Sequence, residues 1–179
     1  LKQAGADVTA LKVAAEKEPA QDVEASADVV IVGGGGAGLA AACSATENGA
    51  TVIVVEKMGT LGGNSMVSGG IYNAPDPEAQ APLGIEDSPE FFAQQTWEGG
   101  DKIANKELVD EMCFNALDGL KWMESMGLEI KPGVGQGTGS LYQRTHYAVL
   151  PQGSGYIKAF VETLMTREDL CTIMMDTTA

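Results

Sequence analysis

The sequence predicts an α/β fold in which helices flank a parallel β-sheet. Two β-branched runs, Asp28–Val32 and Thr51–Val55, have the composition expected of strands that are buried on both faces. A glycine cluster follows the first run, and a small, apolar segment that ends before Gly49 separates the two runs. The order strand, glycine turn, helix and strand forms a right-handed crossover, so we expect the two strands to be parallel.

The first half of the chain adds a linker, a helix and two irregular stretches. Residues 1–26 are rich in Ala, Lys and Glu and predict a short helix followed by a linker. The first long helix is expected over Ala37–Asn48, with Gly49 at its C′ position. Gly, Ser and Asn dominate Met58–Ala74, which predicts an irregular loop, and the proline-rich stretch Asp76–Asp87 predicts a surface excursion.

The second half predicts three helices and a strand. One helix is expected to begin at Ser88-Pro89, with serine as the N-cap and proline at the first helical position. Apolar residues at three- and four-residue steps predict a single helix over Lys106–Met126, which Gly127 ends. A further helix is expected over Gly155–Arg167 and a strand over Cys171–Met175.

Composition excludes several classes of function. The 179 residues contain 25 Asp and Glu against 11 Lys and Arg, a net charge of -14, so we expect no nucleic-acid partner. No apolar run is long enough to cross a bilayer, and we expect no direct membrane insertion. Three scattered cysteines and the single histidine, His146, predict no metal site. The compartment stays open between extracytoplasmic (periplasmic or cell-surface) and cytoplasmic.

The glycine cluster has the spacing of a phosphate-binding turn, Gly33-x-Gly35-x-x-Gly38. Gly33 would make the tight turn, Gly35 would let a pyrophosphate approach the backbone, and Gly38 would let helix and strand pack closely. Glu56 follows the second strand, about 20 positions further on, where an acid can accept both hydroxyls of an adenosine ribose. The same acid disfavours a 2′-phosphate, so the pattern predicts a dinucleotide other than NADP.

A second glycine-rich segment indicates which dinucleotide binds. Gly62-Gly63-Asn64-Ser65 is followed closely by Ser68-Gly69-Gly70. An NAD dehydrogenase has no need of such a loop directly after its second strand. A flavin does, because the backbone must come close to its ring and ribityl chain, and Asn and Ser can donate to its oxygens. The predicted cofactor is therefore FAD.

Three stretches resemble the flavoprotein subunits of the fumarate reductase/succinate dehydrogenase family. The resemblance is to the soluble branch of flavocytochrome-type fumarate reductases and urocanate reductases. It is carried by ADVVIVGGGGAGLAAA (27–42), VVEKMGTLGGNSMVSGGIYNA (54–74) and QRTHYAVLPQGSGY (143–156). It implies a Rossmann-like FAD-binding domain of which residues 27–179 are an incomplete N-terminal part, with the capping domain absent.

The resemblance also implies roles for individual residues. His146 and Arg144 correspond to a stretch whose histidine binds a substrate carboxylate, although Tyr147 and Ala148 replace the Arg-Pro that follows it in the family. No catalytic residue falls within these 179 residues, because the family's proton-donating arginine comes later. The cofactor-binding residues implied are Gly33, Gly35, Gly36, Ala37, Gly38, Glu56, Lys57, Gly62, Gly63, Asn64, Ser65, Ser68, Gly69 and Gly70.

The family reaction implies the function. It is hydride transfer from reduced FAD to the C=C bond of a fumarate-, urocanate- or acrylate-like α,β-unsaturated carboxylate. The electrons would come from a haem or FMN domain or from a separate protein. Two alternatives remain, a ketosteroid-type FAD dehydrogenase acting on a neutral substrate and a non-catalytic nucleotide-binding fragment. As an N-terminal piece of a larger enzyme, the chain alone is expected to be inactive.

Overall fold

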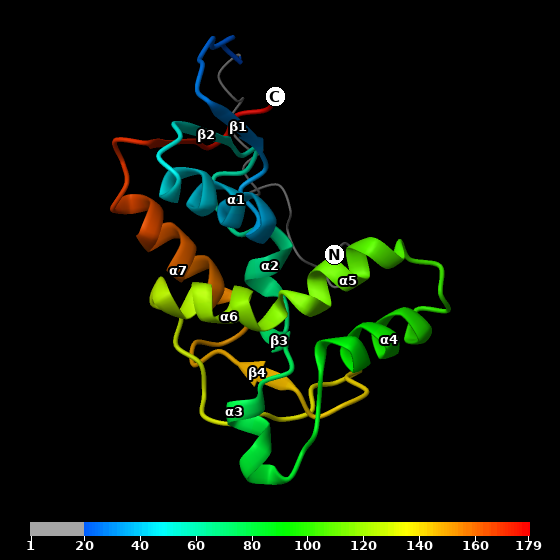
Figure 1. The fold of residues 1–179 in the computed structure, drawn as a ribbon. Helices are drawn as coiled ribbons and strands as arrows, with labels where there is room; N and C mark the ends of the chain where they lie inside the picture. Colours follow the sequence, from blue (N-terminus) through cyan, green and yellow to red (C-terminus); the bar gives the residue numbers. More distant parts are fainter. Residues whose placement is uncertain (1–19) are drawn as a thin grey trace, which may run out of the picture.

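A computed structural model describes residues 20–179 of the chain (Figure 1). The short helix predicted within residues 1–26 lies largely outside the described residues, and residues 20–26 have no helix or strand. The elements, in chain order, are β1 (Val29–Val32), α1 (Gly36–Glu47), β2 (Val52–Val55), α2 (Gly63–Val67), β3 (Ile71–Asn73), α3 (Pro77–Gln80), the 3-10 turn η2 (Ala81–Leu83), α4 (Pro89–Gly99), α5 (Lys106–Phe114), α6 (Ala116–Ser125), β4 (Thr145–Tyr147), α7 (Ser154–Met165) and β5 (Cys171–Met174).

The main sheet is parallel, as predicted. Its strand order is β1–β2–β5, with Val29 opposite Val52 and Val52 opposite Cys171. Helix α1 packs against β1 and β2, α7 packs against α1, and α6 packs against α7. The chain segments that follow the three strands meet at the carboxyl edge of the sheet, which is where ligands bind in open α/β sheets.

Helix α1 ends as the sequence predicts. Gly49 has a φ of +81°, a left-handed conformation that glycine adopts without strain. Its amide donates to Thr46 O, and the amide of Ala50 donates to Ala45 O. These two bonds form a Schellman motif, so they satisfy carbonyl groups at the helix end and turn the chain into β2.

The prediction that the first strand is buried on both faces is wrong. Val30 is 55% exposed and Val32 is 72% exposed, whereas Val54 of β2 is fully buried. The difference follows from position in the sheet. Among the described residues β1 is an edge strand and only α1 covers it, while β2 lies between two neighbours and beneath α1.

The segment predicted as an irregular loop over Met58–Ala74 contains helix α2 and strand β3 instead. Strand β3 pairs antiparallel with β4, and Tyr72 lies opposite His146. Each strand has only three residues, and its partner lies more than 70 residues away in the sequence. Pairing with a partner that far along the chain leaves no signal in the local sequence. The Gly-, Ser- and Asn-rich composition therefore predicted a loop where the structure has a strand.

The proline-rich stretch Asp76–Asp87 is not a simple surface excursion. It forms α3 and η2, and Gln80 is 1% exposed. The Gln80 side chain accepts from the amide of Asp76 and donates to the Asp87 carboxylate and to Gln143 O. Asp76 caps α3 by accepting from two amides of its first turn, so the segment is a folded element tied to the β4 side of the molecule.

The helix predicted over Lys106–Met126 is two helices. They meet at Asn115, whose φ of -100° and ψ of 5° break the helical path and whose side chain donates to Glu111 O. The break lets α5 pack on α4 in a small core with Val109 and Cys113, while α6 packs in the main core through Leu120. In Figure 1, α4 and α5 lie together to one side of the β3–β4 pair.

Other helix boundaries were predicted correctly. The Ser88 hydroxyl accepts from the amide of Phe91 at the start of α4, and Gly127, with a φ of +91°, ends α6. Across the described part of the chain, no helix has the length and apolar character needed to span a membrane.

Candidate functional site

The turn between β1 and α1 depends on two glycines. Gly33 has a φ of +105°, which side chains rarely adopt. A Cβ on Gly38 would lie 1.9 Å from the Gly33 carbonyl oxygen, so α1 can start this close to the strand only with glycine there. These are the tight turn and the close helix–strand contact expected from the sequence.

The space in front of this turn is open and is faced by free backbone amides. A Cβ on Gly35 would meet nothing within 4 Å. Among residues 20–179, the amides of Ala37 and Gly38 have no backbone or side-chain acceptor, and the first turn of α1 contains no acidic residue. Free amides and the positive end of a helix dipole are what a diphosphate requires, so the residues present fit that part of FAD.

Glu56 lies beside this space with its carboxylate already fixed. One carboxylate oxygen accepts from the amide of Gly34 and the other from the amide of Met58, both at 2.8 Å. The bond from Gly34, followed by that from Met58, lowers the pKa of Glu56 below its usual value. Each oxygen keeps a lone pair, which suits two ribose hydroxyls. Lys57 is exposed next to it.

Gly34 is a site residue that sequence reasoning missed. A Cβ on Gly34 would lie 2.5 Å from Leu61 Cδ2 and 3.3 Å from Glu56 Cβ, so a side chain there would force Leu61 to move next to the bonded carboxylate. Its place inside the Gly33–Gly36 cluster was the only signal for it, because the spaced motif Gly33-x-Gly35-x-x-Gly38 leaves this position unspecified.

We predict that the contribution of Glu56 disappears in acid. Its pKa is depressed in the folded protein, so the contribution is complete above the usual value of 4.5 and is lost as the pH falls through the lower folded value. FAD affinity should therefore be flat from neutral pH down to the usual value of 4.5 and decline only as the pH falls through the lower folded pKa of Glu56. The measurement is FAD titration of the apoprotein, kept dilute because the isoelectric point is about 4.3.

Glu56→Gln is the matched variant for this experiment. It should bind FAD more weakly at neutral pH. Its FAD affinity should also fall less in acid, because it has no Glu56 carboxylate to protonate. An acid decline that is identical in both proteins would show that another group is responsible.

The second glycine turn lies directly against the first. The amide of Gly62 donates to Gly34 O at 2.8 Å, and Gly35 and Gly62 form an isolated parallel bridge. The amide of Gly36 donates to Ser65 Oγ at 3.3 Å, and a Cβ on Gly36 would lie 2.7 Å from that oxygen. The structure thus brings the two turns together, as an extended cofactor that crosses both would need.

The remaining residues of the second turn border solvent. Asn64, Ser68 and Gly69 are exposed, and a Cβ on Gly69 would meet nothing within 4 Å. Gly63 has a φ of +48° and packs near Gly35, while Gly70 is buried with a φ of +67°. Both turns therefore have a glycine, Gly35 in the first and Gly69 in the second, that borders open space.

His146 pairs across the small sheet with Tyr72, which follows Gly70 of the second turn by two residues. The histidine is buried on β4, and its Nε2 is 3.2 Å from the carbonyl oxygen of Ala74. Its role toward a substrate carboxylate stays a prediction.

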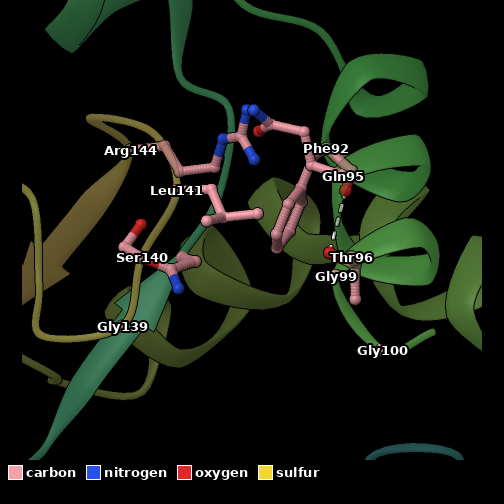
Figure 2. Close-up of a pocket in the computed structure, with 10 residues that line it drawn as sticks. Phe92, Gln95, Thr96, Gly99, Gly100, Gly139, Ser140, Leu141 and Arg144 are labelled. Carbon is pink, nitrogen blue, oxygen red and sulfur yellow. Dashed lines mark hydrogen bonds between the residues drawn. The ribbon is translucent and has the colours of Figure 1, made fainter.

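Arg144 is held by an ion pair at the edge of a cavity. Its Nε and Nη2 donate to the two carboxylate oxygens of Asp87 at 2.7 and 2.8 Å, and both side chains are almost fully buried. The guanidinium carbon lies 4.6 Å from the ring centre of Phe92. Figure 2 shows this group reaching toward Phe92 and Gln95 in a cavity of about 380 Å³. These contacts give Arg144 a structural function, and a role in substrate binding stays a prediction.

The part of the chain that the structure describes contains no group of three His, Cys, Asp or Glu side chains placed to hold a metal ion. Burial raises the pKa of the Cys43 thiol to about 11, so this cysteine is unreactive at neutral pH.

Comparison with known proteins agrees with this geometry. Residues 28–179 match the family described as FAD binding domain. The chain is 37% identical over 158 residues to a fumarate reductase (cytochrome) of Shewanella frigidimarina, covering 86% of this chain and 27% of that protein. It is 38% identical over 96 residues to a urocanate reductase of Eggerthella lenta, covering 54% of this chain and 16% of that protein.

A solved structure is also similar. It is the open conformation of a flavocytochrome c3 fumarate reductase, with a TM-score of 0.73 and 31% identity over 84% of this chain and 26% of that chain. The chain thus spans about a quarter, or less, of the length of these relatives. The matches confirm the predicted fumarate reductase-like resemblance and the Rossmann-like fold. The chain belongs to the FAD binding domain family, and its cofactor is FAD.

Proposed function

We propose that the chain is the FAD-binding portion of a flavin-dependent reductase that transfers a hydride to the C=C bond of an α,β-unsaturated carboxylate. One observation carries the proposal. Two glycine turns are joined through Gly62 and Ser65 around open space, with the Glu56 carboxylate at one side. The relatives' names, fumarate reductase and urocanate reductase, supply the substrate class.

The chain's own residues bind and orient the cofactor. The amides of Ala37 and Gly38 would hold the diphosphate, Glu56 would hold the ribose, and the Ser68–Gly70 turn would lie beside the flavin half. The chemistry that FAD supplies when bound is two-electron hydride transfer. Fixing both ends of a long cofactor keeps the flavin in one orientation toward a substrate, which is the protein's contribution to such reactions.

The test uses the full-length protein with its flavin reduced by a dye under anaerobic conditions. Fumarate, urocanate and acrylate should reoxidise the flavin, with a saturated product formed in equal amount. Oxidation of a 3-ketosteroid with no response to the three acids would favour the dehydrogenase alternative instead. FAD binding without turnover of either class would favour the non-catalytic reading.

The electron donor is part of the same proposal. A haem or FMN domain, or a separate redox protein, would reduce the flavin, and the relative named fumarate reductase (cytochrome) supports a haem. Full-length protein that shows haem or FMN absorption beside that of FAD would identify the donor.

A further inference from the structure

We propose that Gln152 and Tyr156, at the start of α7, are positioning residues for FAD. They contact the Ser68–Gly70 turn at Gly70, on the side away from the open space at Gly69. These contacts fix how closely the turn approaches the cofactor. This inference rests on the FAD site of the proposed function and extends that site to a segment more than 80 residues away in the sequence.

The backbone of Gln152 is packed tightly against Gly70. A Cβ on Gly70 would lie 1.8 Å from the Gln152 carbonyl oxygen and 2.9 Å from its Cα. Gly70 also has a φ of +67°, and Gln152 itself has a φ of +55°, which is uncommon for a residue with a side chain. Strained conformations of this kind persist where the surrounding structure requires them, and they cluster at ligand sites.

The next residue makes a second backbone contact with the turn. A Cβ on Gly153 would lie 1.7 Å from Ser65 O and 3.0 Å from Ser68 Oγ. Ser68 Oγ in turn donates to Ser65 O and accepts from the amide of Gly70. The start of α7 and the second glycine turn therefore fit together as two backbone surfaces.

Tyr156 adds the only side-chain hydrogen bond recorded between α7 and this turn in the described structure. Its hydroxyl donates to the Gly70 carbonyl oxygen at 3.2 Å, and its ring stacks on Tyr72 with centroids 6.3 Å apart. Burial raises the pKa of Tyr156 to about 12, so the hydroxyl keeps its proton and remains a donor at neutral pH. Since Gly69 faces open space, the turn is held on one side and free on the other.

The test compares Tyr156→Phe with Tyr142→Phe in the full-length protein. Each variant removes one hydroxyl that donates to a backbone carbonyl, Gly70 O for Tyr156 and Glu86 O for Tyr142. Tyr156→Phe should weaken FAD binding by roughly 3- to 10-fold, the worth of about one hydrogen bond, and should shift the visible absorption band of the bound flavin. Tyr142→Phe should change neither.

Thermal unfolding of the two apoproteins separates positioning from simple stability. If the melting temperatures fall equally and only Tyr156→Phe binds FAD more weakly, the inference is supported. Wild-type FAD affinity and an unshifted spectrum in Tyr156→Phe would overturn it while leaving the FAD site intact. Failure of the wild-type protein to bind FAD would instead overturn the site and the proposed function together.

Gln152→Gly removes the Gln152 side chain and keeps its backbone, so it tests which of the two positions the turn. Glycine adopts the left-handed conformation without strain and keeps the carbonyl that packs on Gly70, so FAD affinity should stay within about twofold of wild type. A large loss in this variant would mean that the Gln152 side chain, rather than its backbone, acts on the cofactor, and would contradict the packing argument.

Discussion

Replacing Gly35 by leucine should abolish FAD binding without unfolding the protein. The backbone at Gly35 has φ -77° and ψ -177°, an extended conformation that any residue adopts, and its Cβ would meet nothing within 4 Å. The new side chain would occupy the space in front of the Ala37 and Gly38 amides. Losing these charge-assisted hydrogen bonds should raise the FAD dissociation constant by at least about 100-fold. FAD titration measures it, and circular dichroism reports the fold.

Two other glycines provide controls for this prediction. Gly38→Ala should mainly lower the stability of the fold, because its Cβ would lie 1.9 Å from Gly33 O. Gly99→Ala should affect neither property, because its Cβ would make only an ordinary 3.4 Å contact with Leu141. Unchanged FAD affinity in folded Gly35→Leu protein would place the diphosphate elsewhere.

Replacing Arg144 by leucine should cause the largest loss of stability. The variant leaves the Asp87 carboxylate buried without its cation, and removing one partner of a buried ion pair costs about 3–5 kcal/mol. The Phe92 ring also loses the guanidinium group that lies against it. Urea denaturation measures the change in the free energy of unfolding.

A double variant identifies the cause of this loss. Arg144→Leu combined with Asp87→Asn removes the unpaired charge but keeps an acceptor for the Ser88 amide, so it should recover part of the stability. Lys158→Met breaks an exposed ion pair with Glu162 and should cost less than about 1 kcal/mol. A fully stable Arg144→Leu protein that failed only in substrate turnover would favour the substrate-binding role over the structural one.

The sequence predicted the order of β1, the glycine turn, α1 and β2 correctly because its signals are local. Gly33 and Gly49 have a positive φ, and Gly38 lies too close to the Gly33 carbonyl for a side chain, so in each case residues nearby in the sequence explain why glycine is needed. The β-branched strands, the spacing of the glycines and the position of Glu56 after the second strand all predicted the same nucleotide-binding unit. The helix start at Ser88 was equally local.

What the sequence did not reveal depends on distant contacts. Strand β3 forms only because β4 pairs with it, and Gln80 is buried only because Asp87 and Gln143 lie nearby in space. The exposure of Val30 depends on which strands neighbour β1, which a β-branched run does not encode. Asn115 interrupts a regular apolar period, and beyond this break α6 leaves the small core of α5 and reaches the main core through Leu120.

The contact between Gly70 and Gln152 has a consequence for synthesis on the ribosome. The diphosphate turn and Glu56 emerge early and are joined by the hydrogen bond from the Gly34 amide to the Glu56 carboxylate, so the nucleotide part of the site depends on residues made first. The turn at Gly70 can settle only after residues 152–156 have emerged, since they provide its support. Synthesis runs from the N-terminus at about 5–20 residues per second, so residues 33–70 are available several seconds before residues 152–156. The nucleotide end of the site should therefore mature before the isoalloxazine end, and stable FAD retention should wait for α7.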